Sequence, residues 1–176
     1  VQWLASNRKR GSTCRAALLE MKYGDNALRG NAGLLKHLKD INNVFADRDS
    51  KEALFRMMEA QFDQLDQFGL LQFKRCTNGT RVHLDANDRP EVIFILVNHN
   101  PRSKKLETIL NDAALNEFAQ SPHFDLKFFV ATYGGYGLHA DCMLSLSKFR
   151  QHLNGQRNTG TFPADQGKQM AERTSA

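Results

Sequence analysis

The chain has 176 residues, of which 41% are hydrophobic and 24% are charged, and it carries a net charge of +5. This is the length of one ordinary globular domain, large enough to bury a hydrophobic core. The sequence has no apolar run of the roughly 20 residues that a membrane-spanning helix needs, and no signal peptide is visible, so we expect a cytoplasmic protein.

The positive charge is concentrated at the start of the chain. Residues 1–40 hold eight Lys or Arg against three Asp or Glu, so the rest of the chain is neutral overall. A polyanionic partner such as nucleic acid would explain this distribution. An exposed basic loop that keeps the protein soluble would explain it as well.

The three cysteines, Cys14, Cys76 and Cys142, are widely spaced. None lies at a zinc-finger interval from another Cys or from a His. We expect reduced, buried thiols rather than a disulfide framework.

Residues 1–23 have the pattern of a β-hairpin. Residues 1–5 are typical of a short strand, residues 6–12 are polar and contain a glycine, and residues 14–23 alternate as a second strand does. Helical spacing of apolar residues then predicts a helix over 28–45.

The remainder of the chain alternates between predicted helices and strands. A helix over 50–71 has Asp49 or Ser50 as a plausible N-cap. The run VIFILV at 92–97 is apolar throughout, which is typical of a strand buried on both faces of a covered sheet. The other predicted elements are a short strand at 81–84, a helix at 103–119, a strand at 126–132 and a helix at 139–153.

This order of elements predicts a single α/β domain over residues 1–153, with a mixed central sheet flanked by helices on both sides. Residues 154–176 are rich in Gly, Gln, Thr and Ser and lack apolar periodicity. We expect them to form a loosely ordered polar tail.

The charged pair Glu20 and Lys22 stands out on the strand at 14–23. The two residues are two positions apart, so they project from the same face, which they share with the apolar residues Ala16 and Leu18. Such a placement is costly unless a metal, a phosphate or the opposite charge meets them.

The run from Leu18 to Gly24, LLEMKYG, resembles the E-x-K half-motif of the PD-(D/E)xK, or restriction-endonuclease-like, nucleases. In that family the half-motif lies on a hairpin strand and is followed by a core helix, as the predicted helix at 28–45 follows here. The resemblance implies a restriction-endonuclease-like core and a Mg²⁺-dependent nuclease that hydrolyses DNA in restriction, repair or defence, with Mn²⁺ as a possible substitute.

The family's residue roles transfer to three positions of this chain. The resemblance implies that Glu20 and the backbone carbonyl of Met21 bind the metal ion. Lys22 would orient or help to deprotonate the attacking water and stabilise charge on the scissile phosphate. These roles suit the chemistry, because a metal ion lowers the pKa of bound water toward neutrality and a nearby cation stabilises added negative charge.

The family pattern has a second acid, an Asp at the start of the preceding hairpin strand. No Asp or Glu precedes Glu20 in this chain. Either the acid lies upstream of Val1, which we favour, or it has been replaced and the site binds without cleaving.

Basic residues near the half-motif are candidates for nucleic-acid contacts. Three lie in the predicted hairpin loop and three on the following helix: Arg8, Lys9, Arg10, Arg29, Lys36 and Lys39. For each of them a solvated helix or loop surface is an equally good explanation. A homodimer would suit a nuclease that cuts two strands.

Several other polar residues are weaker candidates. Asn26, Asn31 and His37 are possible water- or metal-positioning groups, and Asn98, His99 and Asn100 follow the buried strand, where sites often lie in open α/β sheets. The Gly134–Gly137 loop lacks a full nucleotide-binding fingerprint, and His139 with Cys142 lacks a third catalytic group.

Two other functions compete with the nuclease. One is a non-catalytic nucleic-acid-binding or assembly module that keeps the fold and has lost the site. The other is a nucleotide-binding α/β domain that uses the strand exits near Asn98 and Gly134.

Overall fold

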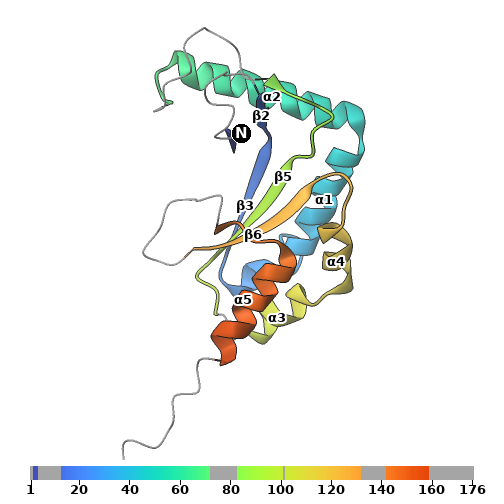
Figure 1. Ribbon diagram of the computed structural model, residues 1–176, viewed down its shortest axis with the longest axis vertical. Coiled ribbons are helices and arrows are strands. Elements are labelled where there is room, and N and C mark those ends of the chain that lie inside the picture. The colour runs from blue at the N-terminus through green and yellow to red at the C-terminus, as the bar shows by residue number, and fades with distance from the viewer. Residues whose placement is uncertain (1, 4–12, 72–82, 101, 132–141, 159–176) are drawn as a thin grey trace, which may run out of the picture.

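The computed structural model of the protein describes residues 2–3, 13–71, 83–100, 102–131 and 142–158. These residues form two three-stranded sheets with helices between and after the strands, so the α/β class is confirmed (Figure 1). The smaller sheet has the order β1 (Gln2–Trp3), β2 (Thr13–Arg15) and β4 (His83–Leu84). The larger sheet has the order β3 (Ala17–Tyr23), β5 (Glu91–Val97) and β6 (Asp125–Ala131).

The predicted strand at 14–23 is divided between the two sheets at Ala16. On one side of it, β2 pairs antiparallel with β1, which confirms an N-terminal hairpin. On the other side, β3 pairs parallel with β5, and β5 pairs parallel with β6. The larger sheet is therefore parallel throughout, whereas the sequence predicted a mixed one. Mixed pairing is confined to the smaller sheet, because the hairpin partner reaches only β2.

The helices differ from their predicted bounds mainly at their ends. They are η2 (Asp25–Leu28), α1 (Leu34–Ala46), α2 (Arg48–Gln67), α3 (Lys104–Leu110), α4 (Ala113–Ala119) and α5 (Leu146–Asn158). The N-cap of α2 is Asp47, whose carboxylate accepts from the backbone N–H of Ser50 at 2.9 Å. The single helix predicted over 103–119 is two helices, because the side chain of Asp112 caps a new one by accepting from the backbone N–H of Ala114. Likewise, α5 begins later than predicted and continues into the predicted tail.

A tight turn explains why α1 begins at Leu34 rather than at residue 28. Gly30 has a φ of +78°, a left-handed conformation that glycine adopts at little cost. At Gly33 a Cβ atom would lie 2.8 Å from the backbone carbon of Arg29, so the close approach of the chain excludes a side chain there. The turn brings the start of α1 beside the end of β3.

The main hydrophobic core lies on one face of the larger sheet, which we call the helix-covered face. It carries Val92, Phe94 and Leu96 of β5, which are fully buried. The rings of Phe94, Phe128 and Phe149 stack in series, with centroids 6.1 and 5.2 Å apart. The same core cluster holds buried residues from α1 through α5.

The opposite face of the larger sheet has a smaller core made by Ile93, Ile95 and Phe129. The described helices contribute no residue to this second cluster, whereas the sequence predicted helices on both sides. On the same face of β3, the side chains of Leu19, Met21 and Tyr23 are exposed.

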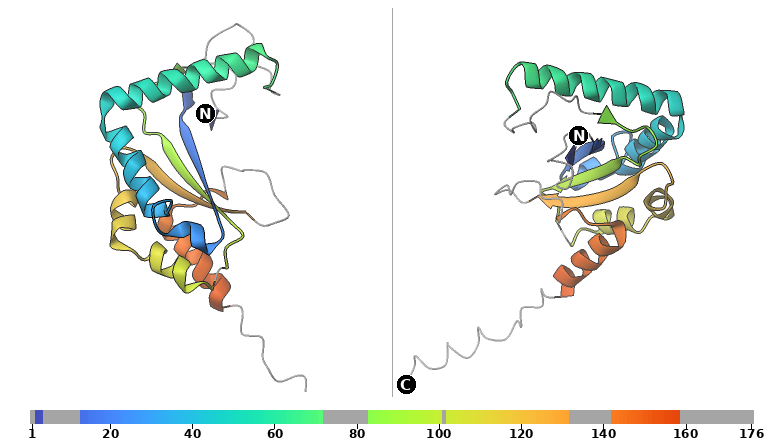
Figure 2. Two further views of the ribbon diagram at one scale, coloured as in Figure 1. Left: turned by 180° about the vertical axis from the view of Figure 1, so that it is seen from behind. Right: turned by 45° about the horizontal axis from the view of Figure 1, so that its top comes forward.

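The ends of the larger sheet have different surroundings. The long helix α2 crosses near the amino-terminal ends of its strands, whereas α3 and α5 lie toward the carboxyl-terminal ends (Figure 2). Within the described ranges, β3 has a neighbouring strand on one side only. None of the helices described is long and apolar enough to cross a membrane.

Candidate functional site

Glu20 and Lys22 lie on the helix-covered face of β3, on the shared face that strand alternation predicted. Lys22 is buried, with 3% of its surface exposed. The side chain of Glu20 keeps 29% of its surface exposed and lies at the rim of the core. A buried ammonium group is costly to desolvate, so its position depends on the polar groups around it.

Three groups surround the Lys22 ammonium. Its Nζ lies 2.9 Å from Oε1 of Glu20 and donates to the carbonyl of Ala32 at 2.5 Å. The third group is Nδ1 of His37, at 3.1 Å from Nζ. Ala32 belongs to the turn before α1 and His37 to its first turns, so the docking of α1 completes the site.

His37 also contacts Glu20 directly, with Nδ1 at 2.7 Å from Oε1. A carboxylate only accepts hydrogen bonds, so Nδ1 carries the proton and donates it to Glu20. Nζ of Lys22 is also a donor, so its approach to Nδ1 is a contact between two donors and not a hydrogen bond. In the neutral ring, Nε2 of His37 is left with the lone pair.

The two donors beside Glu20, Lys22 and His37, set its charge. Partial burial alone would raise the pKa of this carboxyl group. The ammonium of Lys22 and the imidazole of His37 outweigh that effect and lower the pKa below its ordinary value of 4.5. Glu20 is therefore a carboxylate at neutral pH, available to a cation.

The backbone carbonyl of Met21 lies at the edge of β3 that faces away from β5, which we call the open edge because no described strand pairs there. The bonds from Glu91 N to Ala16 O and from Gly24 N to Val97 O show that the even-numbered residues of β3 bond to β5. In a parallel ladder the peptide groups of the odd-numbered residues then point to the other edge.

The donors near Glu20 fit a metal ion only in part. They are one carboxylate, one imidazole and one backbone carbonyl at the strand edge. In the described ranges, no group of three or more His, Cys, Asp and Glu side chains is placed to hold a metal ion. The carboxylate and the carbonyl are oxygen ligands of the kind that Mg²⁺ prefers, and a Mg²⁺ ion held by them would complete its shell with water, phosphate oxygens or a further carboxylate.

The other polar candidates have separate surroundings. Asn26 accepts a hydrogen bond from Nζ of Lys105 at 2.9 Å, and Asn31 is exposed. The ring of His99 is buried and contacts Asp25 and the backbone of Lys22. Of these candidates, the structure brings only His37 into contact with Glu20.

The basic candidates that the structure describes are all exposed. Lys36 forms an ion pair with Asp40 one helical turn away, Lys39 lies three residues further along α1, and Arg29 lies at the end of η2. Arg8, Lys9, Arg10, Gly134–Gly137 and His139 lie outside the described residues. Cys14 is a free, buried thiol as expected, whereas Cys142 is free but exposed, and Cys76 lies outside the described residues.

We compared the chain with protein-family models, curated proteins and solved structures. None matches it. The side chains of the site and the resemblance at residues 18–24 remain as the indications of function.

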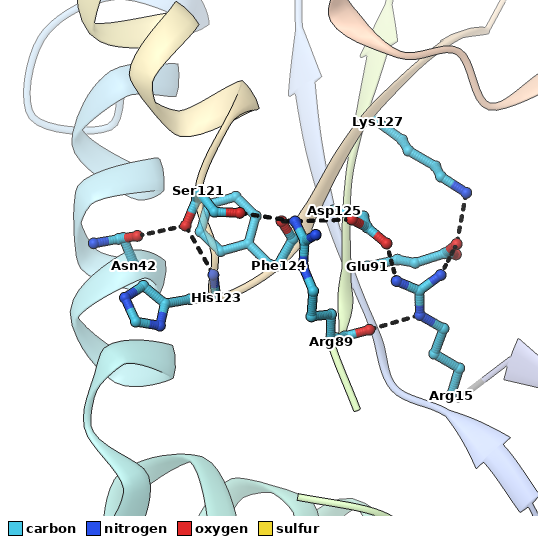
Figure 3. A network of polar contacts seen from close by, with 9 residues as sticks. All are labelled: Arg15, Asn42, Arg89, Glu91, Ser121, His123, Phe124, Asp125 and Lys127. Carbon is cyan, nitrogen blue, oxygen red and sulfur yellow. Dashed lines mark hydrogen bonds and ion pairs between the residues drawn. The ribbon is translucent and has the colours of Figure 1, made fainter. Parts of the chain in front are cut away.

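A second charged cluster, which the sequence did not predict, lies at the amino-terminal ends of the three parallel strands (Figure 3). Glu91 is buried, and its Oε1 accepts from Arg15 at 3.1 Å and from Lys127 at 2.6 Å. Asp125 pairs with Arg15 and with Arg89. These contacts join β2, β5 and β6.

The second cluster differs from the Glu20 site in its chemistry. The side chain of Asp125 is 35% exposed, but each of its two oxygens is paired with a guanidinium group, and Glu91 is buried with two cationic partners. In Glu20 both described contacts fall on the one oxygen Oε1. The one unpaired buried atom among the described side chains is Oε2 of Glu91. We infer that this cluster stabilises the fold.

A polar groove of about 590 Å³ lies between α2 and β4. Its Glu59 accepts from the backbone N–H of Leu84 at 2.6 Å and lies 3.2 Å from Nδ1 of His83. Glu59 is thus committed to holding β4 against α2. The groove contains neither Glu20 nor Lys22, so its size does not identify the reactive site.

Proposed function

We propose that the protein is a metal-dependent nuclease with a restriction-endonuclease-like core that hydrolyses phosphodiester bonds of DNA at Glu20 and Lys22. The observation that carries the proposal is the convergence of Lys22 and His37 on one oxygen of Glu20, at 2.9 and 2.7 Å. A buried amine beside a partly exposed carboxylate combines a cation-binding group with a fixed positive charge. Phosphodiester hydrolysis needs both.

Each residue has a separate role in this proposal. Glu20 and the carbonyl of Met21 would hold Mg²⁺, or Mn²⁺ in its place, and the bound ion would supply a more acidic water and neutralise phosphate charge. Lys22 would stabilise the charge that develops on the scissile phosphate. His37 would hold the carboxylate of Glu20 in place through Nδ1. The exposed Arg29, Lys36 and Lys39 would contact the DNA backbone.

The proposal needs a second acidic ligand, because a single carboxylate holds Mg²⁺ weakly. Asp25, the next acid along the chain, bonds to His99 and does not reach Glu20 among the contacts described. A strand beside the open edge of β3 would bring an acid next to both Glu20 and the Met21 carbonyl.

One observation favours a second candidate function. Oε1 of Glu20 is already neutralised by Lys22 and His37, as it would be in a protein that keeps the fold but has lost the metal. That protein would be a nucleic-acid-binding or assembly module without cleavage.

The two functions are separated by cleavage and binding assays on the same DNA. Under the nuclease proposal, Glu20→Ala and Lys22→Ala each abolish Mg²⁺-dependent cleavage and leave DNA binding largely in place. Cleavage that is unchanged in both variants would sink the assignment. A wild type that binds DNA but never cleaves it with Mg²⁺ or Mn²⁺ would establish the second candidate.

A further inference from the structure

The loop that follows β5 reaches across to the end of β3. Asn98 begins the loop with a φ of +54°, in the left-handed region that Asn tolerates better than most residues. Its side-chain amide donates to the hydroxyl of Tyr23 at 3.1 Å. The next residue, His99, inserts its ring beneath the same strand end, with 3% of the side chain exposed.

Both nitrogens of the His99 ring face hydrogen-bond acceptors. Nε2 lies 2.9 Å from the backbone carbonyl of Lys22, and Nδ1 lies 3.0 Å from Oδ1 of Asp25. A backbone carbonyl only accepts, so Nε2 donates to Lys22, and the carboxylate of Asp25 lies beside the other ring nitrogen.

Asp25 is itself fixed on its other side. Partial burial raises its pKa, but hydrogen bonds from Ser103 and His99 outweigh burial and lower it below its ordinary value of 3.8. Ser103 caps α3, and its backbone N–H donates to the carbonyl of Asn100 at 2.9 Å. The His99 ring thus connects the backbone of Lys22 to the start of α3.

We propose that His99 is a positioning residue for Lys22, holding the backbone of the lysine so that its amine meets Glu20. The reason is geometric. The Lys22 peptide belongs to the ladder with β5, and the His99 ring is a second partner on its carbonyl, two residues before Gly24, where the chain turns after β3. Without the ring the ladder alone would hold this peptide, and a small rotation there would move the amine away from Oε1. The inference rests on the proposed function for its effect on catalysis, but its effect on Lys22 exists in the free protein.

Two substitutions separate the two hydrogen bonds of the ring. In His99→Gln the side-chain amide lies where Nε2 was and keeps a donor for the Lys22 carbonyl. In His99→Asn the amide lies where Nδ1 was, so it still bonds to Asp25 but no longer reaches Lys22. Gln also replaces more of the buried ring's volume than Asn does, so His99→Phe, which fills the place of the ring without donating to either acceptor, is the control for volume. A protein in which His99 merely fills space would keep the wild-type Lys22 environment in His99→Phe.

The first measurement is the NMR signal of the Lys22 side chain in the full chain, without metal or DNA. We expect His99→Asn to shift the Lys22 Cε and Nζ resonances and His99→Gln to leave them near the wild-type positions. Wild-type resonances in His99→Asn would overturn the proposal. If His99→Asn fails to fold, His99→Phe replaces it. That variant has no donor for the Lys22 carbonyl, and unshifted Lys22 resonances there would overturn the proposal equally.

The second measurement is steady-state cleavage of DNA with Mg²⁺. Removal of a supporting hydrogen bond typically costs about 10- to 100-fold in activity, so we expect kcat to fall by at least about tenfold in His99→Asn. KM should stay within about twofold, and His99→Gln should recover most of kcat. The matched control is His83→Asn, an exposed histidine on β4, with wild-type kinetics.

A negative result in one measurement leaves the other decisive. A wild type that does not cleave DNA contradicts the proposed function, and the Lys22 resonances still decide the role of His99. Cleavage in the wild type with equal loss in His99→Asn and His99→Gln contradicts only the positioning role.

Discussion

Replacement of Lys22 by Met distinguishes a functional lysine from a structural one. Met has a similar length and no charge, so the variant removes the buried ammonium without opening a large cavity. The variant also removes the hydrogen bonds that the ammonium donates to Glu20 and to the carbonyl of Ala32. Hydrogen bonds to charged groups contribute about 1.5–3 kcal/mol each, and the desolvation of an ammonium group costs several kcal/mol.

At Lys22 the lost hydrogen bonds and the avoided desolvation cost nearly cancel, because neither Glu20 nor Ala32 is left isolated in the variant. Glu20 keeps His37 at 2.7 Å and stays partly open to solvent, and Ala32 lies in an exposed turn. We therefore expect Lys22→Met to change the free energy of unfolding by less than about 1.5 kcal/mol in either direction. That corresponds to a Tm shift below about 6 °C for a domain of this size. Cleavage should fall by about 100- to 1,000-fold, as when one group that stabilises the transition state is removed.

Lys127→Met is the matched control, since Lys127 also pairs with a carboxylate on the larger sheet but lies in the second charged cluster. Its removal leaves the buried carboxylate of Glu91 with Arg15 as its only cationic partner in that cluster. We expect a loss of about 1–3 kcal/mol with cleavage intact. Urea unfolding and plasmid cleavage of both variants test the pair. A loss above about 3 kcal/mol in Lys22→Met, or unchanged cleavage, would refute the reasoning.

Three further predictions address the core, the pH dependence and the DNA surface. Phe149→Ala removes a buried ring that stacks on Phe128 and should lower the free energy of unfolding in urea by about 3–5 kcal/mol. Phe68→Ala, at an exposed position, should lower it by less than about 0.5 kcal/mol. Equal effects would contradict the described core. Because the pKa values of Glu20 and Asp25 are lowered in the folded state, their contribution to stability should be complete above their ordinary values of 4.5 and 3.8 and lost as pH falls through the lowered ones. Glu20→Gln should reduce this loss of stability at acid pH. An unchanged loss would show that Glu20 lacks its partners. The double variant Arg29→Ser with Lys39→Ser should reduce the slope of log K against log [salt] for DNA binding. The reduction should be about one unit for each phosphate that the protein no longer neutralises. An unchanged slope would show that these residues do not contact DNA.

The larger elements of the fold could be predicted from local patterns. The apolar run at 92–97 is β5, buried on both faces except at its last residue, and alternation placed Glu20 and Lys22 on one face. The bounds that failed depended on single capping and turn residues. Asp112 starts a new helix within the predicted one, and the close approach at Gly33 delays α1.

Strand pairing could not be predicted in the same way. Whether residues 17–23 pair with the hairpin strand or with β5 depends on partners about 70 residues apart, which alternation does not specify. The second charged cluster has the same cause. Arg15, Glu91 and Asp125 meet only because three strands align in one register.

About half of the candidate site could be predicted from the sequence. Glu20 and Lys22 follow from the sequence, because a strand has a fixed period. His37 was only a weak candidate, since its contact with Glu20 depends on how α1 docks against β3. For His99 the strand-exit position was visible, but its contact with the Lys22 carbonyl required the left-handed turn at Asn98.

The central claim is that Glu20 and Lys22 form a metal-dependent phosphodiesterase centre. The most direct test is the initial rate of plasmid cleavage against Mg²⁺ concentration for the wild type and Glu20→Gln, purified side by side and assayed with a chelator control. The account predicts a saturable, chelator-sensitive rate in the wild type and a loss of at least about 100-fold in Glu20→Gln, which retains the shape of the side chain without its charge. A rate that does not depend on the metal, or that is equal in the two proteins, would contradict it.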